Sequence, residues 1–494
     1  MHSRTGKSPK PHPERLKVEH VNVVPPTKLK PAIGGTLVGN FMEWYDFGIY
    51  GYLAVVMTGV FASGLPTQWQ LLATLLGFAV SFLVRPLGGL VLGPLGDKFG
   101  RRKILFFTMS VMAGATALIG LLPTANTLGV WALVLLYLLK MLQGFSTGGE
   151  YAGAATYVAE FAPDRKRGFF SSMLDTGSYM GFAAGATVVG LTTWISTSVS
   201  GPDAMAEYGW RIPFLTAIPL GIIAVWLRSR LPETPAFEVA EASADLTDVD
   251  HDDPYARHGF IGLIRHHWRP LLVAMAIVAA TNSAGYALTS YMPVYLEEEV
   301  GYSSITSALA TVPVLVVMSI CIPIVGFISD RVGRRPVYAA AAIATVVLTV
   351  PAFKLMHLGT LAWVMVALSL IAIPVALWVG PSAAALPALF PTATRYTGMG
   401  LSYNLAVSAF GGTTPLFTQA LMQWTGNNLM PAFYIMFFSI IAGVAILAIG
   451  ESARKPLTGS LPIVATHTEA RALVAFQDRN PDLDLETIRV PVNA

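Results

Sequence analysis

Residues 93–102 read GPLGDKFGRR, and residues 326–335 read GFISDRVGRR. In both, a glycine is followed four residues later by an aspartate, and then by a second glycine and two arginines. The positions are Gly93, Asp97, Gly100, Arg101 and Arg102 in the first copy and Gly326, Asp330, Gly333, Arg334 and Arg335 in the second. The copies lie 233 residues apart, and this spacing predicts a chain made of two similar halves.

The composition places most of the chain in lipid. Of its 494 residues, 54% are hydrophobic and only 12% are charged, whereas a soluble domain carries about 25% charged residues. The mean hydropathy is +0.57. This much apolar surface exceeds what one soluble core can bury, so the composition predicts an all-α membrane protein.

A helix needs about 20 apolar residues to cross the hydrocarbon core of a bilayer. Twelve stretches meet this requirement, so we expect twelve transmembrane helices in two six-helix halves. Their approximate limits are 32–60, 70–93, 104–123, 129–160, 169–198, 210–229, 270–296, 305–328, 337–356, 361–389, 397–424 and 429–450.

One long polar connector separates the two sets of six stretches. It contains an acidic run, EVAEASADLTDVDHDD, at residues 238–253. The predicted parts of the chain are an N-terminal tail (1–31), an N-terminal six-helix bundle (32–229), this linker (230–269), a C-terminal six-helix bundle (270–450) and a C-terminal tail (451–494).

Lysine and arginine are concentrated in one set of short loops. These basic loops lie at 97–103, 164–167 and 331–335, while the alternate loops are almost free of Lys and Arg. Basic loops stay on the cytoplasmic side of a membrane. We therefore expect a multi-pass protein of the cell inner (plasma) membrane, with both termini in the cytoplasm.

The repeated motif also predicts a contact between the halves. Its glycines let neighbouring helices approach closely. Its aspartate, at a helix end, can cap the N-terminus of a neighbouring helix or pair with an arginine. We expect the motif to latch the halves together in an outward-facing state; simple anchoring of the topology by its basic residues is the alternative.

Longer segments resemble a known family. They include GNFMEWYDFGIYGYLA at 39–54, FLVRPLGGLVLGPLGDKFGRRK at 82–103 and KMLQGFSTGGEYAGAATYVAEFAPDRKRGF at 140–169. These segments resemble the major facilitator superfamily and, within it, the metabolite–proton symporters. The resemblance implies the major facilitator fold and transport by alternating access, with a proton as the co-transported ion.

Two further segments, LDTGSYMGFAAGA at 174–186 and ATNSAGYALTSYMPVYL at 280–296, most resemble the proline/glycine-betaine symporters. The resemblance implies import of a small zwitterionic osmolyte. Relatives that carry citrate, 2-oxoglutarate or shikimate share many of the N-terminal motifs, so a carboxylate metabolite is the alternative cargo. The C-terminal tail lacks the coiled-coil heptads by which some osmolyte carriers sense osmotic pressure.

Several ionisable residues fall inside predicted spans, where a charge is costly and indicates function. The first span carries Asn40, Glu43, Asp46 and Tyr50 on one helical face. The second carries Arg85. The fourth carries another polar face, made of Lys140, Gln143, Glu150 and Tyr151.

These spans hold three carboxylates, those of Glu43, Asp46 and Glu150, but only two bases. If both bases pair, one carboxylate remains, and burial without a counter-charge favours its protonated form. We predict that Glu43 or Asp46 carries the coupled proton; a fully paired structural network is the alternative. Asp175, near the expected cytoplasmic end of the fifth span, is a further candidate.

An aromatic cage suits a quaternary or iminium nitrogen, and a cation opposite it, Lys140 or Arg85, suits the carboxylate of a zwitterion. A polar seventh span, with Thr281, Asn282 and Thr289, is expected to line the same cavity. The candidate substrate-binding residues are Asn40, Trp44, Tyr50, Arg85, Lys140, Gln143, Tyr151, Tyr286, Tyr291 and Trp378.

The sequence contains no phosphate-binding G-x-x-x-x-G-K-[ST] loop, no Cys/His cluster with metal-ligand spacing and no nucleophile–base constellation. We therefore expect neither an enzyme nor a cofactor or metal. The expected partners are a small solute, a proton and membrane lipid, without nucleic acid, and we expect a monomer. A non-transporting membrane sensor is the alternative from another functional class.

Overall fold

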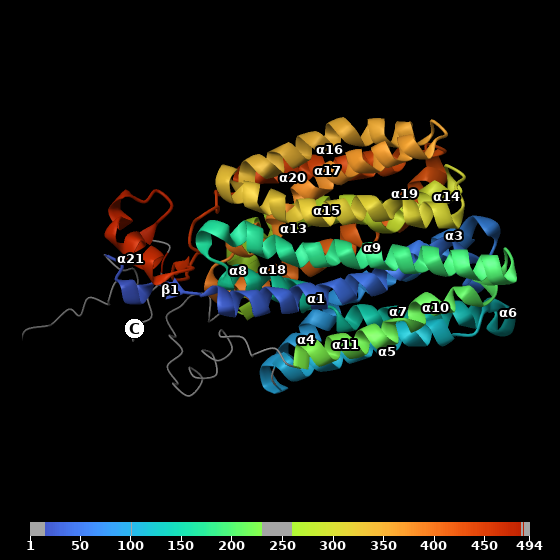
Figure 1. Ribbon diagram of the computed structural model, residues 1–494, viewed down its shortest axis with the longest axis horizontal. Coiled ribbons are helices and arrows are strands. Elements are labelled where there is room, and N and C mark those ends of the chain that lie inside the picture. The colour runs from blue at the N-terminus through green and yellow to red at the C-terminus, as the bar shows by residue number, and fades with distance from the viewer. Residues whose placement is uncertain (1–14, 100, 230–258, 486–487, 489–494) are drawn as a thin grey trace, which may run out of the picture.

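Long helices that run along one common direction make up most of the protein (Figure 1). The computed structural model describes residues 15–99, 101–229, 259–485 and 488. The described parts of both chain tails lie beyond one end of the bundle, which we call the terminal end; the opposite end is the distal end.

The N-terminal half is a series of helices joined by short turns. Its elements are α1 (Pro26–Tyr52), α2 (Ala54–Phe61), α3 (Thr67–Leu83), α4 (Arg85–Phe99), α5 (Arg101–Leu121), α6 (Ala125–Leu128), α7 (Val130–Ser146), α8 (Glu150–Phe161), η2 (Asp164–Lys166), α9 (Arg167–Ser200), η3 (Met205–Gly209), α10 (Arg211–Leu215) and α11 (Ala217–Ser229).

The C-terminal half follows the same plan. Its elements are α13 (Gly259–Tyr286), η4 (Ala287–Tyr291), α14 (Met292–Glu298), α15 (Ser304–Val332), α16 (Arg334–Met356), α17 (Leu361–Ala385), η5 (Pro387–Leu389), α18 (Thr392–Ala406), η6 (Val407–Gly411), α19 (Thr414–Thr425), α20 (Met430–Ala445) and η7 (Ile446–Ala448).

Eight of the described helices are long and apolar enough to cross a membrane, and Phe106–Leu121 within α5 is a shorter apolar helix. The remaining predicted spans correspond to α1, to α10 with α11, and to α18 with α19. Two limits differ from the expectation: α1 already begins at Pro26, and α13 already begins at Gly259, within the predicted linker. Residues 230–258 of that linker lie outside the described residues.

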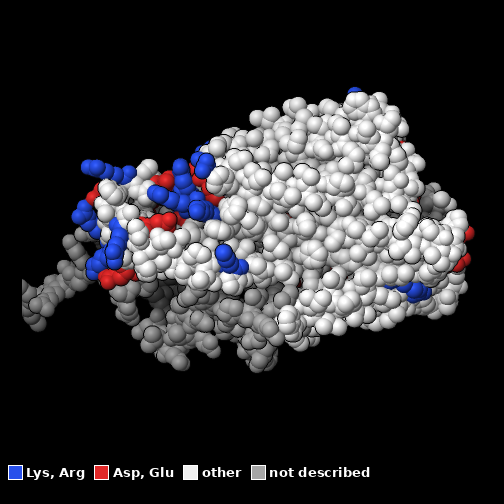
Figure 2. Space-filling view, in the orientation of Figure 1, with Lys and Arg blue, Asp and Glu red and all other residues white. Residues whose placement is uncertain are grey.

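The flank of the bundle is apolar. Figure 2 shows charged side chains gathered at the terminal end, whereas the broad middle of the visible face is almost free of them. Large exposed side chains include Leu90, Trp131, Ile320, Ile343 and Val444. Such a surface would aggregate in water, so it fits a lipid environment.

Two glycines let the helices of the N-terminal half cross at backbone contact. A side chain at Gly144 would collide with the backbone oxygen of Ser81, and one at Gly148 would collide with that of Arg85. The crossing brings Arg85, at the start of α4, against Thr147, at the end of α7. The Nε–H of Arg85 donates to Thr147 Oγ1 at 3.0 Å.

The second copy of the repeated motif joins the two halves at the terminal end. Asp330, near the end of α15, accepts hydrogen bonds from the backbone N–H groups of Gly168 (2.8 Å) and Phe169 (2.9 Å) at the start of α9. It also pairs with Arg334 at 2.7 Å. A carboxylate at a helix N-terminus satisfies unpaired N–H groups and complements the helix dipole.

Of the five residues named in the first copy, the structure describes the backbone of four. Gly100 lies outside the described residues, and so do the side-chain environments of Gly93, Asp97, Arg101 and Arg102. The latch that the sequence predicts for these residues, and its link to an outward-facing state, stays a prediction.

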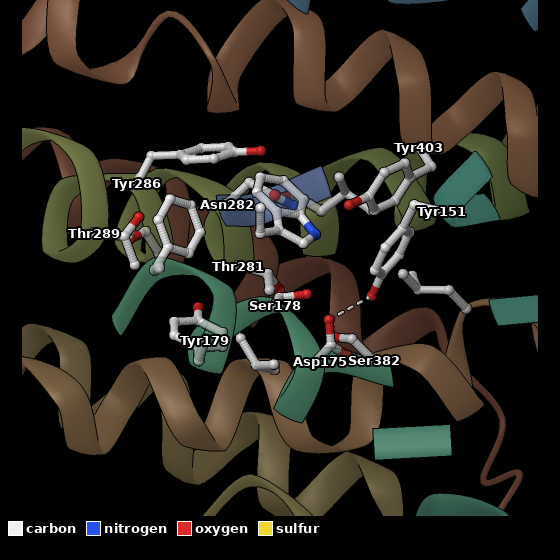
Figure 3. A pocket seen from close by; sticks show the side chains of 16 residues that line it. Tyr151, Asp175, Ser178, Tyr179, Thr281, Asn282, Tyr286, Thr289, Ser382 and Tyr403 are labelled. Carbon is white, nitrogen blue, oxygen red and sulfur yellow. Dashed lines mark hydrogen bonds between the residues drawn. The ribbon is translucent and has the colours of Figure 1, made fainter. Parts of the chain in front are cut away.

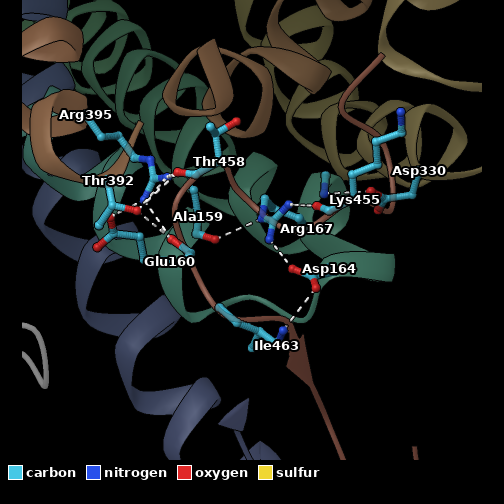
Figure 4. A network of polar contacts seen from close by, with 12 residues as sticks. Ala159, Glu160, Asp164, Arg167, Asp330, Thr392, Arg395, Lys455, Thr458 and Ile463 are labelled. Atoms are coloured by element: carbon cyan, nitrogen blue, oxygen red, sulfur yellow. Dashed lines mark hydrogen bonds and ion pairs between the residues drawn. The ribbon is translucent and has the colours of Figure 1, made fainter. Parts of the chain in front are cut away.

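Residues 451–464 cross the terminal end and contact both halves; we call them the strap (Figure 4). On the C-terminal half, Glu451 accepts from the N–H groups of Arg334 and Arg335. The carbonyl of Thr458 accepts from Arg395 at 2.8 Å. On the N-terminal half, the carbonyl of Lys455 accepts from Arg167 at 2.8 Å.

The strap ends in a small sheet that unites the two tails. Strand β2 (Ile463–Val464) pairs in parallel with β1 (Asn22–Val23). The N–H of Ile463 donates to Asp164 at 3.0 Å, and Asp164 forms a buried ion pair with Arg167. Beyond the strap, α21 (His467–Ala475) and η8 (Gln477–Arg479) lie beside η1 (Val18–His20). A pairing of two residues leaves no recognisable pattern in the sequence, so the contact between the two tails could not be predicted from it.

Arg395 is the residue to test in this network, because its buried guanidinium contacts the strap and also pairs with Glu160 of the N-terminal half at 2.7 Å. We expect Arg395→Lys to lower the melting temperature and to expose the strap to trypsin after Arg454. A lysine cannot reproduce the donors of a guanidinium, and each lost hydrogen bond to a charged group costs about 1.5–3 kcal/mol.

The measurement is limited proteolysis of purified protein together with thermal unfolding. The matched control is Arg331→Lys, an arginine at the same end whose guanidinium lies over the ring of Phe327 in its own helix. Equal cleavage rates in the two variants and the wild type would show that Arg395 does not hold the strap.

Candidate solute site and buried charge network

A cavity lies between the two halves (Figure 3). The N-terminal half contributes side chains from α1, α8 and α9, and the C-terminal half contributes side chains from α13, η4, α17 and α18. The lining residues are Trp44, Tyr151, Asp175, Ser178, Tyr179, Phe182, Val278, Thr281, Asn282, Gly285, Tyr286, Thr289, Val379, Ser382, Leu386 and Tyr403.

Aromatic rings form much of the wall. Trp44 lies at the centre of one group, with its ring centroid 5.7 Å from that of Tyr286 and 5.4 Å from that of Phe182. Tyr151 stacks on Tyr403 across the two halves, at 4.3 Å and an interplanar angle of 14°. Such faces attract a positively charged nitrogen through the ring quadrupole.

Local hydrogen bonds fix the orientation of Trp44. Its Nε1–H donates to Asn40 Oδ1 at 3.0 Å, one helical turn earlier in α1. The amide of Asn40 in turn donates to the carbonyl of Leu174 at 2.8 Å and to the hydroxyl of Ser178. Asn40 therefore supports the cavity wall from behind.

One charged side chain lines the cavity among the described residues, that of Asp175. The hydroxyl of Tyr151 donates to Asp175 Oδ1 at 2.9 Å (Figure 3). Asp175 Oδ2 is buried and has no hydrogen-bond partner among the described residues. The sequence predicted Asp175 near the cytoplasmic end of its span. In the structure α9 begins at Arg167, two turns before Asp175, and the side chain of Asp175 lines the cavity.

The halves touch on both sides of the cavity. Toward the terminal end, Asp330 caps α9. Beside the cavity, Asn404 of α18, the neighbour of the lining residue Tyr403, donates to the carbonyl of Gly148 at 2.8 Å. Toward the distal end, a Cβ on Gly51 of α1 would lie 3.2 Å from Cα of Ser290 in η4. Solute can enter or leave only if one of these contacts opens.

A second group of charges lies behind the wall, in the N-terminal half. Glu43 and Arg85 form an ion pair, and both are buried. Arg85 is also packed against rings, with its guanidinium carbon 4.7 Å from the ring centroid of Phe82 and 5.6 Å from that of Trp44. The pair therefore touches the back of the cavity wall without lining the cavity.

Asp46 and Lys140 are connected through two neutral side chains. Lys140 Nζ donates to Gln143 Oε1 at 2.6 Å, and Gln143 Nε2 donates to Thr116 Oγ1 at 2.8 Å. The hydroxyl of Thr116 donates to Asp46 Oδ2 at 3.0 Å. Asp46 forms no ion pair within 4.0 Å among the described residues, and Lys140 lies over the rings of Phe47 and Tyr50.

The predicted site residues thus fall into three places. Trp44, Tyr151 and Tyr286 line the cavity. The polar and charged residues behind the wall are Asn40, Glu43, Asp46, Tyr50, Arg85, Lys140 and Gln143. The remaining three belong to neither set: Glu150 at the start of α8, Tyr291 bonded to Gln419, and Trp378 bonded to Thr345.

Sequence reasoning missed Tyr403, Ser178, Tyr179 and Ser382 among the lining residues. Ser178 and Tyr179 follow Asp175 by three and four positions, so they share its helical face and could have been found from that spacing. Tyr403 and Ser382 carried no comparable signal, because their place depends on how the C-terminal half packs against the first.

Comparison with known proteins agrees with this architecture. The family of sugar (and other) transporters matches residues 33–459. The chain is 66% identical over 478 residues to the ectoine/proline transporter ProP of Corynebacterium glutamicum. The alignment covers 97% of this chain and 95% of that protein. It is 40% identical over 477 residues to the proline/betaine transporter of Salmonella typhimurium, covering 96% and 94% of the two chains.

Solved structures show the same fold. The major facilitator superfamily proton:xylose symporter XylE, bound to 6-bromo-6-deoxy-D-glucose, aligns with a TM-score of 0.69 at 16% identity over 87% of this chain and 98% of that one. A partially occluded inward open conformation of XylE from E. coli aligns with a TM-score of 0.65 at 16% identity, over 86% and 98%.

The all-α membrane fold predicted from the sequence is confirmed, and so is the resemblance to proline/betaine carriers. The relatives are named as transporters, and the family is one of transporters, so the prediction that the chain is no enzyme is confirmed as well. The protein is a multi-pass membrane transporter of small solutes that belongs to the sugar (and other) transporter family of the major facilitator superfamily.

Proposed function

We propose that the protein imports a small zwitterionic osmolyte, such as proline, glycine betaine or ectoine, together with protons. The observation that carries this proposal is the aromatic cavity between the halves, with Asp175 as its charged lining residue. The names of the relatives, an ectoine/proline transporter and proline/betaine transporters, support the same solute class.

The cavity disfavours the alternative cargo. A di- or tricarboxylate such as citrate needs several cations within reach, and among the described residues that line the cavity there is no Lys or Arg. Asp175 would repel such an anion instead. A zwitterion brings no net charge, so its entry leaves the electrostatics of the site almost balanced.

Transport follows from the contacts on the two sides of the cavity. Opening at the distal end separates α1 from η4, and opening at the terminal end removes Asp330 from the start of α9. We place the terminal end in the cytoplasm of the cell, because the basic loops lie there. Alternation between the two openings carries the solute inward.

Asp46 is the proposed site of proton coupling. The other acid favoured from the sequence, Glu43, is paired with Arg85, whereas Asp46 reaches Lys140 only through Thr116 and Gln143. A buried carboxylate without a cation beside it can hold a proton, and the relay lets Lys140 respond when that proton leaves. Glu150, at the start of α8, remains a further candidate for coupling.

Competition for uptake tests the solute class. In proteoliposomes with an imposed pH gradient, we expect excess glycine betaine to suppress uptake of labelled proline by more than tenfold, and citrate to leave it unchanged. Protein-free liposomes are the control. Suppression by citrate would favour the carboxylate alternative, and accumulation of no solute at all would favour a membrane sensor.

Exchange and accumulation separate coupling from binding. We expect Asp46→Asn to abolish proton-driven accumulation while exchange of labelled for unlabelled solute, measured without a gradient, persists within about threefold, because a permanently neutral side chain permits closure but releases no proton. Gradient-driven accumulation at the wild-type level in this variant would contradict the assignment.

Glu43→Gln should behave differently, because it leaves the guanidinium of Arg85 buried without its carboxylate. Removing one partner of a buried ion pair costs about 3–5 kcal/mol. We therefore expect a clear drop in melting temperature for Glu43→Gln, and recovery in the double variant with Arg85→Met. The measurement is thermal unfolding in detergent; a wild-type melting temperature in the single variant would contradict the structural role of the pair.

A further inference from the structure

The buried carboxylate of Asp175 is only partly hydrogen-bonded by its neighbours. It is only 6% exposed, and Tyr151 satisfies just one of its two carboxylate oxygens. No lysine or arginine forms an ion pair with it among the described residues. A buried carboxylate without a partner is costly, so the site is incomplete as it stands.

The surroundings of Asp175 indicate what is missing. Its free oxygen borders a cavity whose walls include the stacked rings of Tyr151 and Tyr403 and the ring of Trp44. Carboxylate and aromatic faces both attract positive charge, and together they select a cation with an apolar surface, such as an alkylated nitrogen. A small metal ion would need more oxygen ligands than one carboxylate supplies.

The far side of the cavity offers a different chemistry. Figure 3 places Tyr286 across the cavity from Asp175, and the hydroxyl of Tyr286 is buried without a hydrogen-bond partner among the described residues. A phenol can donate a hydrogen bond to a carboxylate. The cavity thus has an anionic end and a hydrogen-bonding end, as a zwitterion requires.

We propose that Asp175 is the counter-ion for the positively charged nitrogen of the transported solute, which it holds against Tyr151, Tyr403 and Trp44, while the hydroxyl of Tyr286 donates to the solute's carboxylate. The inference rests on the proposed function, because it assigns the recognition of a zwitterion to this cavity. It reverses the expectation from the sequence, in which Arg85 or Lys140 selects the solute through its carboxylate and Asp175 is a candidate proton carrier.

Discrimination between glycine betaine and its carbon isostere tests the assignment directly. In 3,3-dimethylbutanoate a neutral carbon replaces the charged nitrogen, while size and carboxylate stay the same. We expect the wild type to bind glycine betaine at least about 100-fold more tightly than the isostere. In Asp175→Asn, affinity for glycine betaine should fall about 10- to 100-fold, and the ratio of the two affinities should collapse to below about 5.

Binding is measured by displacement of labelled proline from purified protein in detergent, so that no gradient or coupling enters the result. Asp175→Glu keeps the charge and should retain at least part of the discrimination. The control Glu207→Gln removes an exposed carboxylate in the distal turn η3 and should match the wild type. Melting temperatures identify any variant that fails to fold. If Asp175→Asn does not fold, Asp175→Glu decides: a ratio of the two affinities that differs from the wild-type ratio supports the counter-ion role, and an unchanged ratio contradicts it.

The outcomes separate this inference from the proposed function. If the wild type binds neither proline nor glycine betaine, the proposed solute class fails. If the wild type binds them and Asp175→Asn discriminates as strongly as before, the counter-ion role is wrong. If Asp175→Asn keeps wild-type binding and exchange but loses accumulation, Asp175 carries the proton instead, and the inference is overturned.

Discussion

A charge inside a lipid-embedded bundle has no water to solvate it, and this constraint explains where the polar residues of the protein lie. Glu43 is matched by Arg85, Asp164 by Arg167, and Asp330 by Arg334 and the start of α9. Each of these carboxylates meets a cation, and that of Asp330 also meets backbone N–H groups. The exceptions, Asp46 and Asp175, lie beside the cavity or directly behind its wall, where a proton or a solute can supply what the protein does not.

Backbone contact at glycines makes these placements possible. At Gly144 and Gly148 the absence of side chains lets two helices of the N-terminal half touch, which brings Arg85 beside Thr147 and within reach of Glu43. At Gly168 and Gly326 the same feature brings α9 and α15 together across the halves. Contacts between rigid backbones separate or form as a whole, which suits the alternate opening that we propose for the two halves.

The tails add a constraint that the helical bundle does not require. The strap contacts Arg334 and Arg395 of one half and Arg167 of the other, and it ends in the strand that pairs with the N-terminal tail. Arg167 and Arg395 are suited to this role because one guanidinium donates to several carbonyl groups at once. The terminal end is therefore closed by the chain ends as well as by the helices.

The sequence by itself predicted the membrane fold, twelve spans in two halves and the polar faces of α1 and of α7 with α8, because each depends on local composition and helical period. It also supplied Trp44, Tyr151 and Tyr286 of the cavity wall. Only the tertiary structure decided which acids are paired. Glu43 and Asp46 lie on the same face of one helix, so the sequence does not distinguish them; in the folded protein Glu43 pairs with Arg85, whereas Asp46 accepts a hydrogen bond from Thr116. It also brought Asp175 and Tyr403 into one cavity, since that contact exists only when the two halves pack together.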